Sequence, residues 1–143
     1  MSKILIIEHR RYNDVADLLL KSVINTISGN GVEYDLVSVP RLRDLPVTVS
    51  YAEASPRARM MRGYIGYILI GARLAEEEKF HEYPLTCILQ DVEKIKLDKA
   101  VAIGTGIVSG FNTVEEALAV APEVGRMAAI NCLKLLAIKR SLM

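Results

Sequence analysis

Cysteine is scarce in this chain of 143 residues, which has two thiols, Cys87 and Cys132. Neither belongs to the closely spaced pairs that bind zinc or carry out thiol redox chemistry, so no metal site is predicted. Both fall in segments with the apolar spacing of amphipathic helices. We therefore expect two reduced core residues and a cytoplasmic protein.

A long apolar segment is also missing from the amino terminus, where Met1-Ser2-Lys3 leads into the short apolar run of residues 4–7. This run is too short for the apolar region of a signal peptide or for a membrane span. We expect no export segment and no membrane partner.

An excess of one charge sign is the third absence, because 18 Lys and Arg residues face 17 Asp and Glu residues, a net charge of +1. Nucleic-acid surfaces show a marked basic excess, so no nucleic-acid partner is expected. Charge is local instead: Arg57, Arg59 and Arg62 precede an apolar run, and Glu76 to Glu78 follow it. The hydrophobic fraction of 51% predicts burial of some surface between subunits.

That apolar run, residues 64–70, is the most informative stretch of the chain. A continuous apolar run that ends at a glycine, here Gly71, is typical of a central parallel strand buried on both faces. Ligands of open α/β sheets bind at the carboxyl ends of such strands. The segment from Gly71 to Tyr83 is therefore the predicted site of chemistry.

Apolar runs and helical patterns alternate along the rest of the chain. Strands are expected at residues 3–8, 33–39 and 99–104, and residues 33–39 begin with polar side chains that favour the sheet edge. Helices are expected at residues 13–28, 46–55, 84–95, 113–121 and 122–140, with Thr113 and Glu116 forming a capping box. This order predicts one α/β domain over residues 1–143, with a four-stranded parallel sheet and helices on both faces.

Several motifs then give the chain a family resemblance over nearly its whole length. They are Ile6-Ile7 through Tyr12-Asn13; Val39-Pro40 with Asp44-Leu45-Pro46; Gly71-Ala72; Gly106-Ile107-Val108-Ser109 with Asn112-Thr113 and Glu115 to Ala117; and Gly125 with Ala128-Ala129. In this order and spacing they resemble the lumazine synthases of riboflavin biosynthesis.

The resemblance implies a three-layer, flavodoxin-like domain that assembles into homopentamers or multiples of pentamers, with active sites shared between subunits. It implies an enzyme without a cofactor, which condenses 5-amino-6-ribitylaminouracil with 3,4-dihydroxy-2-butanone 4-phosphate. By position, Tyr12 would stack on the pyrimidine beside Asn13, and Asp44 would take the place of a ribityl-binding Glu. Ala72 and Leu74 would line the ring pocket, and the adjacent subunit would supply Ile107 and Val108.

The phosphate-binding part of the sequence departs from the family pattern. Residues Ala75 to Glu78 stand where the family has its phosphate-binding loop. Repulsion between each carboxylate and a bound phosphate would be on the order of a kcal/mol. When the chain is aligned with the family pattern without gaps, the position of the family's catalytic His is occupied by Phe80. The next residue, His81, is therefore the candidate general acid/base. If the segment is helical, His81 lies about 100° further round.

Cationic residues gather near the expected strand ends, and Arg41 and Arg43 replace a Gly and an aromatic of the family. One hypothesis is a relocated site for an anionic ligand, because Arg presents a fork matched to phosphate or carboxylate. The other is pairing between subunits with Glu76 to Glu82. The predicted cluster consists of His9, Arg10, Arg11, Arg41, Arg43 and Arg73.

Less specific interpretations remain open for the same residues. In these interpretations Tyr12 is an ordinary strand-end aromatic, His81 is a solvated residue in the first turn of a helix, and Glu76 to Glu78 are a solvated helix start. At the level of function, the alternative to a divergent lumazine synthase is a non-catalytic member that forms an oligomeric shell or binds a flavin-like ligand. A monomeric flavodoxin-like binding domain is the third interpretation.

Overall fold

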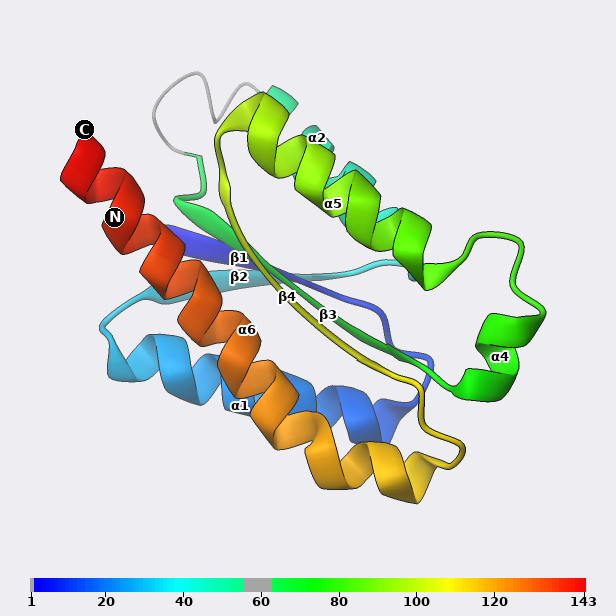
Figure 1. Ribbon diagram of the computed structural model, residues 1–143. Helices are drawn as coiled ribbons and strands as arrows, with labels where there is room; N and C mark the ends of the chain where they lie inside the picture. The colour runs from blue at the N-terminus through cyan, green and yellow to red at the C-terminus, as the bar shows by residue number, and fades with distance from the viewer. Residues whose placement is uncertain (1, 56–62) are drawn as a thin grey trace.

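The computed structural model describes residues 2–55 and 63–143. Its elements follow the chain as an alternation of strands and helices (Figure 1). They are β1 (Lys3–Glu8), α1 (Asn13–Gly29), β2 (Glu33–Ser38), α2 (Asp44–Ala54), β3 (Gly66–Arg73), α4 (Ala75–Lys79), α5 (Leu85–Lys99), β4 (Ala102–Ser109) and α6 (Val114–Leu142). The basic cluster of residues 57–62 lies outside the described residues.

The four strands form one parallel sheet in the order β2-β1-β3-β4, which confirms the predicted fold class. Every residue of β3 is buried, as expected for a central strand. Five of the six residues of β2, by contrast, are exposed, which confirms its expected place at the edge. Parallel β1 and β3 therefore form the middle of the sheet.

Helices cover both faces of the sheet, with α2 and α5 above it and α1 and α6 below it in Figure 1. Side chains alternate between the two faces along each strand. Ile4, Ile6, Ile68 and Ile70 pack into the core on the α1 and α6 side. Leu5, Ile7, Tyr67, Leu69 and Ile103 form a second core on the α2 and α5 side.

The expected end of the central strand at Gly71 is wrong, because β3 continues to Arg73. Gly71, Ala72 and Arg73 pair with Ile107, Val108 and Ser109 of β4, so β4 also extends beyond the expected strand end at Gly104. The absence of a side chain at Gly71 makes room for Leu42, whose Cδ1 would lie 2.6 Å from an added Cβ. The hydrogen-bonded pairing of β3 with β4 therefore continues β3 past the glycine that was expected to end it.

Other expected boundaries also differ from the structure, among them the start of α2, which is Asp44 rather than residue 46. Lys99 belongs to α5, and β4 begins only at Ala102, because Ala100 ends α5 with a left-handed φ of 53°. The two expected helices on either side of Pro122 are one helix, α6. Buried residues of α6 pack on both sides of Pro122, which offsets a cost of about 3 kcal/mol for an interior proline.

The start of α6 confirms part of the expected capping box. The backbone N–H of Glu116 donates to Oγ1 of Thr113 at 3.2 Å. The Glu116 carboxylate contacts the Thr113 hydroxyl at 3.3 Å rather than the Thr113 backbone N–H. The side chain of Thr113 thus satisfies one of the free donors of the first turn.

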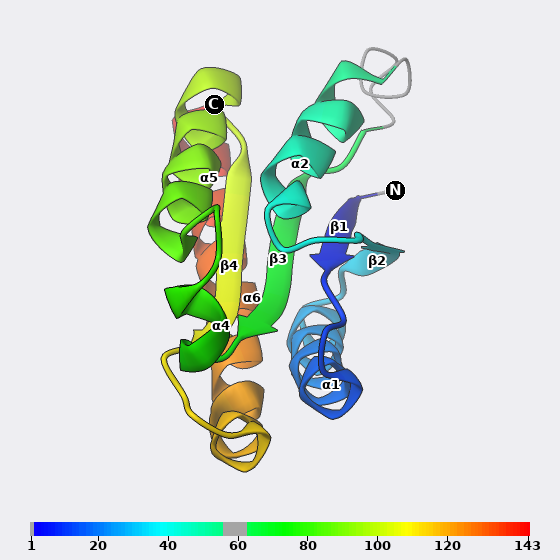
Figure 2. The ribbon, with the colours of Figure 1, turned by 90° about the vertical axis from the view of Figure 1, so that its right-hand side faces the viewer.

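Figure 2 shows the short helix α4 beyond the carboxyl end of β3, just before the chain turns back into α5. The position of α4 decides which groups face the ends of the two central strands. Within the part of the chain that the structure describes, no helix is both long enough and apolar enough to cross a membrane.

Candidate functional site

A pocket of about 310 Å³ lies at the carboxyl ends of β1 and β3. The main chain continues the sheet there, because the N–H of His9 donates to the carbonyl of Ile70 at 3.0 Å. The pocket lies where open α/β sheets bind ligands. Its lining consists of His9, Arg11, Pro40, Arg41, Leu42, Ala72, Arg73, Glu77 and His81.

The alternation of side chains explains why His9 and Arg73 meet in this pocket. His9 follows Leu5 and Ile7 on the α2 and α5 face, and Arg73 follows Tyr67 and Leu69 on the same face of the neighbouring strand. Gly71 lies between them without a side chain, and its hypothetical Cβ would be 3.5 Å from the Cβ of His9. The side chain of Leu42 occupies the space that a side chain at position 71 would need.

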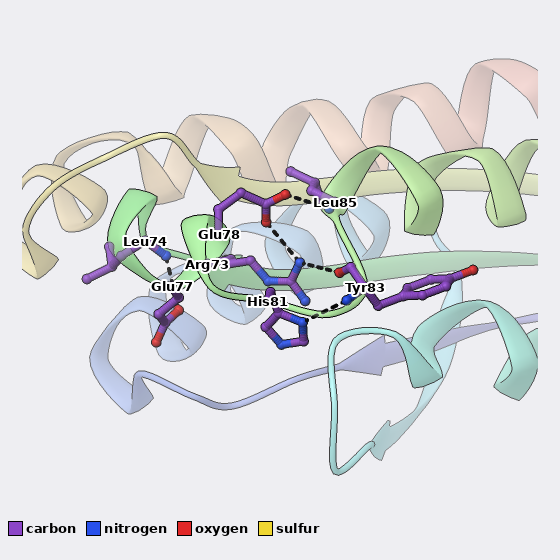
Figure 3. Close-up of polar contacts among 7 residues, drawn as sticks. All are labelled: Arg73, Leu74, Glu77, Glu78, His81, Tyr83 and Leu85. Atoms are coloured by element: carbon purple, nitrogen blue, oxygen red, sulfur yellow. Dashed lines mark hydrogen bonds and ion pairs between the residues drawn. The ribbon is translucent and has the colours of Figure 1, made fainter.

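Arg73 forms the buried cationic wall of the pocket, with 3% of its surface exposed. Its Nη1 donates to the Glu78 carboxylate at 2.9 Å and to the Tyr83 carbonyl at 2.9 Å, as Figure 3 shows. Its Nη2 is buried and has no hydrogen-bond partner among the described residues. One nitrogen of this buried guanidinium is therefore without a hydrogen-bond partner in the described part of the chain.

The helix α4 brings two carboxylates to this cation cluster. Glu77 accepts from Nε of Arg11 at 3.0 Å, from the hydroxyl of Tyr12 and from the backbone N–H of Leu74 at 3.2 Å. Burial alone would raise the pKa of Glu77, but these hydrogen bonds lower the pKa below its ordinary value of 4.5. Glu77 is therefore ionised at neutral pH.

Glu78 is anchored in a similar way. Its carboxylate accepts from Arg73 and from the backbone N–H of Leu85 at 2.8 Å. Burial would raise the pKa of Glu78, but these bonds bring a net lowering. The interpretation as a solvated helix start thus holds only for Glu76, which is 75% exposed and lies 3.9 Å from Lys79.

The predicted cationic cluster comes together in part. His9, Arg11, Arg41 and Arg73 line the pocket. Arg10 turns away to Glu8 at 2.8 Å and Asp17 at 2.9 Å, so it is not part of the site. Arg43 lies over the ring of Tyr83, 4.3 Å from its centroid, beside a neighbouring hollow that Arg41 and His81 share.

Each arginine of the pocket already has a carboxylate partner within the same chain. Arg41 holds Asp44 with two bonds of 3.0 Å, from Nε and Nη2, and the hydrogen bond lowers the pKa of Asp44. Arg11 pairs with Glu77, and Arg73 pairs with Glu78. In this chain the glutamates of α4 pair with Arg11 and Arg73, and not with Arg41 or Arg43.

His9 is half-buried beside these charges, and its Nδ1 is buried without a partner among the described residues. Burial lowers the pKa of His9 from 6.5, and the cation of Arg73 lowers it further, against a smaller opposing effect of Glu77. The imidazole is therefore neutral at pH 7. A neutral imidazole carries one donor and one acceptor nitrogen.

His81 lies at the rim of the same pocket and is exposed. Because α4 ends at Lys79 and α5 begins at Leu85, the helical condition for the 100° offset between Phe80 and His81 is not met. The alternative interpretation of His81 is confirmed as to its exposure and is wrong as to a first helical turn. The backbone N–H of Tyr83 donates to Nδ1 of His81 at 3.3 Å. Phe80, in the family register of the catalytic His, is 80% exposed and does not line the pocket.

The remaining predicted site residues lie around the pocket rather than in it, apart from Ala72, which lines it. The hydroxyl of Tyr12 bonds Glu77, and the guanidinium of Arg11 lies over its ring at 5.6 Å from the centroid. Asn13 accepts from Arg10 at 3.5 Å. Leu74 packs against the α1 and α6 core, and Ile107 against the other core.

Val108 is 1% exposed within the chain. The contribution of Ile107 and Val108 to a neighbouring subunit's site stays a prediction.

Sequence reasoning missed the part that Glu77 plays and the contribution of Pro40 and Leu42 to the lining. The alternation of side chains could have indicated the common face of His9 and Arg73, had the strand been continued past Gly71. The signal for Glu77 is weaker, because its partners Arg11 and Tyr12 lie far away in the sequence. Among the described residues, no cluster of three or more His, Cys, Asp or Glu could hold a metal ion.

These features define an α/β protein with a parallel sheet and a pocket lined by charged side chains at the carboxyl ends of its two central strands. A family model described as 6,7-dimethyl-8-ribityllumazine synthase matches residues 1–140. The chain belongs to this family.

Proteins named 6,7-dimethyl-8-ribityllumazine synthase are its relatives at low identity. The one from Paramagnetospirillum magneticum is 27% identical, over 99% of this chain and 97% of that protein. The one from Sphingopyxis alaskensis is 29% identical, over 97% of this chain and 96% of that protein. The one from Bartonella bacilliformis is 28% identical, over 76% of this chain and 69% of that protein.

Proposed function

We propose that this chain condenses 5-amino-6-ribitylaminouracil with 3,4-dihydroxy-2-butanone 4-phosphate in the pocket above His9 and Arg73. The observation that carries the proposal is the buried guanidinium of Arg73 on the central strand, whose Nη2 has no partner among the described residues. A buried donor without a partner costs about 1–3 kcal/mol, so a ligand oxygen at this point would be favourable.

In this proposal the phosphate binds the relocated cations instead of the family's usual loop. Arg73 contributes Nη2 from the wall, while Arg41 and Arg43 stand at the rim. The carboxylates of Glu77 and Glu78 lie close by, and at an exposed rim each would weaken phosphate binding by about 1 kcal/mol. We therefore expect a weaker phosphate site than a family member with an intact loop would have.

His81 is the proposed general acid. Because its Nδ1 accepts from the backbone N–H of Tyr83, Nε2 is the nitrogen that would carry the proton for donation. Tyr12, Asn13, Asp44, Ala72 and Leu74 would hold the pyrimidine and its ribityl chain. An adjacent copy of the chain would contribute its Ile107 and Val108.

The expected activity is slow but measurable. A displaced general acid/base typically costs about 10²- to 10⁴-fold in rate. Bringing two reactive partners together can by itself supply about 7–11 kcal/mol of the barrier. The loss of the usual His register thus lowers the rate without removing catalysis.

The proposal is tested by mixing purified protein with both substrates and following the absorbance of the lumazine product. We expect slow turnover in the native chain, and a rate at least tenfold lower in Arg73→Gln, because the phosphate loses its buried donor. Arg126→Gln is the matched control, since Arg126 pairs with Glu123 on the surface of α6. The relative from Paramagnetospirillum magneticum calibrates the assay. The proposal fails if the native chain gives no product while the control relative does.

A second candidate function is non-catalytic ligand binding within an oligomeric shell. Two observations favour it: the guanidinium of Arg11 already lies over the ring of Tyr12, and the three pocket arginines are already paired with carboxylates. A large assembly without turnover would support this candidate. In either case we infer one domain over residues 1–143, a homo-oligomer in the cytoplasm, and a site without a cofactor or a nucleic-acid partner.

A further inference from the structure

The short segment between α4 and α5, residues 80–84, is mostly exposed. Residues 80–82 and Pro84 are exposed, whereas Tyr83 is half-buried and packs against the core on the α2 and α5 side. An exposed segment with few apolar contacts has little to fix its conformation. Tyr83 is therefore the point at which this segment is anchored to the core.

Two charged residues hold the ring of Tyr83. The guanidinium of Arg43, directly before α2, lies over the ring at 4.3 Å from its centroid. The hydroxyl of Tyr83 donates to the carboxylate of Asp91 in α5. A cation over a tyrosine ring and a hydrogen bond to a carboxylate are both favourable contacts. The ring thus joins the segment to the start of α2 and to α5.

The main chain of Tyr83 holds two side chains of the pocket. Figure 3 shows its ring turned away from both, while its N–H donates to Nδ1 of His81 at 3.3 Å and its carbonyl accepts from Nη1 of Arg73 at 2.9 Å. His81 and Arg73 line the pocket, and Tyr83 does not. Any effect of Tyr83 on chemistry in the pocket therefore acts through these two residues.

His81 depends on Tyr83 more than Arg73 does. Nη1 of Arg73 has a second acceptor, the carboxylate of Glu78, which the backbone N–H of Leu85 also holds. The imidazole of His81 is exposed, and in the described part of the chain its hydrogen bond is the one from Tyr83. Loss of the anchor should therefore release His81 first.

We propose that Tyr83 is a positioning residue for His81. Arg43 and Asp91 fix the ring of Tyr83, and its backbone N–H in turn holds the imidazole of His81 at the rim of the pocket, with Nδ1 as the acceptor nitrogen. The role in catalysis rests on the proposed function, in which His81 donates the proton from Nε2. The hold of Tyr83 on His81 can be measured without any substrate.

The first test compares Tyr83→Leu with Tyr51→Leu in the condensation assay. Tyr51 lies on α2 and is 68% exposed, so its replacement is the matched control and should change neither kcat nor KM. We expect kcat of Tyr83→Leu to fall by about 10- to 100-fold, because a misplaced catalytic group loses rate steeply. KM should change by no more than about threefold, because Glu78 still holds Arg73.

This split between kcat and KM separates positioning from a purely structural role. A structural role of Tyr83 would lower the folded fraction, which circular dichroism measures. It would leave kcat per folded molecule unchanged.

The second test uses the hydrogen bond between Tyr83 and Asp91, and it stands even if Tyr83→Leu does not fold. Tyr83→Phe keeps the ring and removes the hydroxyl, whereas Asp91→Leu removes the acceptor. Each should lower kcat by about 2- to 10-fold. Because both remove the same bond, the double variant should be about as fast as the slower single variant. Asp91→Asn keeps an acceptor oxygen and should retain most of the native rate.

Nitrogen NMR of the imidazole gives a readout that needs no turnover. The chain contains two histidines, so His9→Gln leaves His81 as the single ring signal. In this background Nδ1 of His81 should show the resonance of a bare nitrogen that accepts a hydrogen bond. Adding Tyr83→Leu should shift this resonance toward that of free histidine, and adding Tyr51→Leu should not.

The inference is overturned if Tyr83→Leu keeps the native resonance of His81, whatever its turnover. It is also overturned if the native chain is active and folded Tyr83→Leu or Tyr83→Phe has the native kcat. An inactive native chain, with the resonance shifted in Tyr83→Leu alone, removes the proposed function and leaves the hold of Tyr83 on His81 in place.

Discussion

Glu77 shows at the scale of one residue how the charges of this site are held in place. The family resemblance implies a phosphate loop at its position, yet its carboxylate binds Arg11, Tyr12 and the backbone of Leu74. The carboxylate thus joins α4 to the segment that follows β1. A residue that looks unfavourable for phosphate binding is, in this structure, a structural bridge.

Stability should therefore depend on the ionisation of Glu77. Because its folded pKa lies below the ordinary 4.5, its contribution is present above that pH and is lost as the pH falls through the folded pKa. Glu77→Gln should lower the free energy of unfolding by about 1–2 kcal/mol at pH 7, and less at about pH 3. Urea unfolding at several pH values measures both effects.

Glu76→Gln is the matched control for this prediction. Glu76 lies in the same turn of α4 but is 75% exposed, and its contact with Lys79 is 3.9 Å long. Its replacement should change stability by no more than about 0.5 kcal/mol at either pH. Parallel pH profiles for the native chain and Glu77→Gln would contradict the bridging role.

At the scale of elements, β4 and α6 approach each other so closely that a glycine is required at position 104. A Cβ on Gly104 would lie 1.9 Å from the carbonyl oxygen of Ala128 and 3.1 Å from the Cβ of Cys132. The helix backbone therefore rests directly on the strand. This contact holds the part of α6 that follows Pro122 in place on the sheet.

Gly104→Ala should lower the free energy of unfolding by about 3 kcal/mol or more, because a helix backbone cannot move aside as a side chain can. Gly29→Ala makes the same chemical change in the last turn of α1, where nothing lies within 4 Å of the added carbon. It should be neutral or stabilising by up to about 1 kcal/mol. Thermal and urea unfolding of the two variants measure the difference, and equal effects would contradict the close contact.

At the scale of the whole molecule, β2 is the strand that the helices covering the sheet leave exposed. Tyr34 and Leu36 are 37% and 42% exposed, and Val37, which points to the opposite face, is 36% exposed. An edge strand with apolar side chains on both faces favours contact with another chain. The high hydrophobic fraction of the sequence fits this surface.

We expect the chain to assemble through this edge, with a pentamer of the 15.8-kDa chain having a mass of about 79 kDa. Leu36→Lys should shift the assembly toward smaller species, because it places a charge on the edge strand. Leu142→Lys, at the exposed end of α6, is the control and should leave the mass unchanged. Sedimentation velocity measures both. A native chain that sediments as a monomer would contradict this expectation.

The sequence by itself determined the order of the four strands, the burial of β3 and the edge position of β2. These features follow from local patterns. The patterns are the apolar run before Gly71, the polar residues at the start of β2, and the helical spacing of apolar residues in the segments between the strands. The sequence also predicted that His9, Arg11, Arg41 and Arg73 lie at one end of the sheet, and the pocket lining confirms this. The carboxyl ends of parallel strands meet at the same edge, whatever the details of packing.

Only the tertiary structure decided where the strands end and which charges pair. Pairing with β4 carries β3 past Gly71, and this turns Arg73 from an expected loop residue into a buried wall. The partners of Glu77 lie 65 and 66 residues away, so no local pattern could reveal them. Charge pairing depends on distances in space, and the sequence fixes those distances only through the packing of the whole chain.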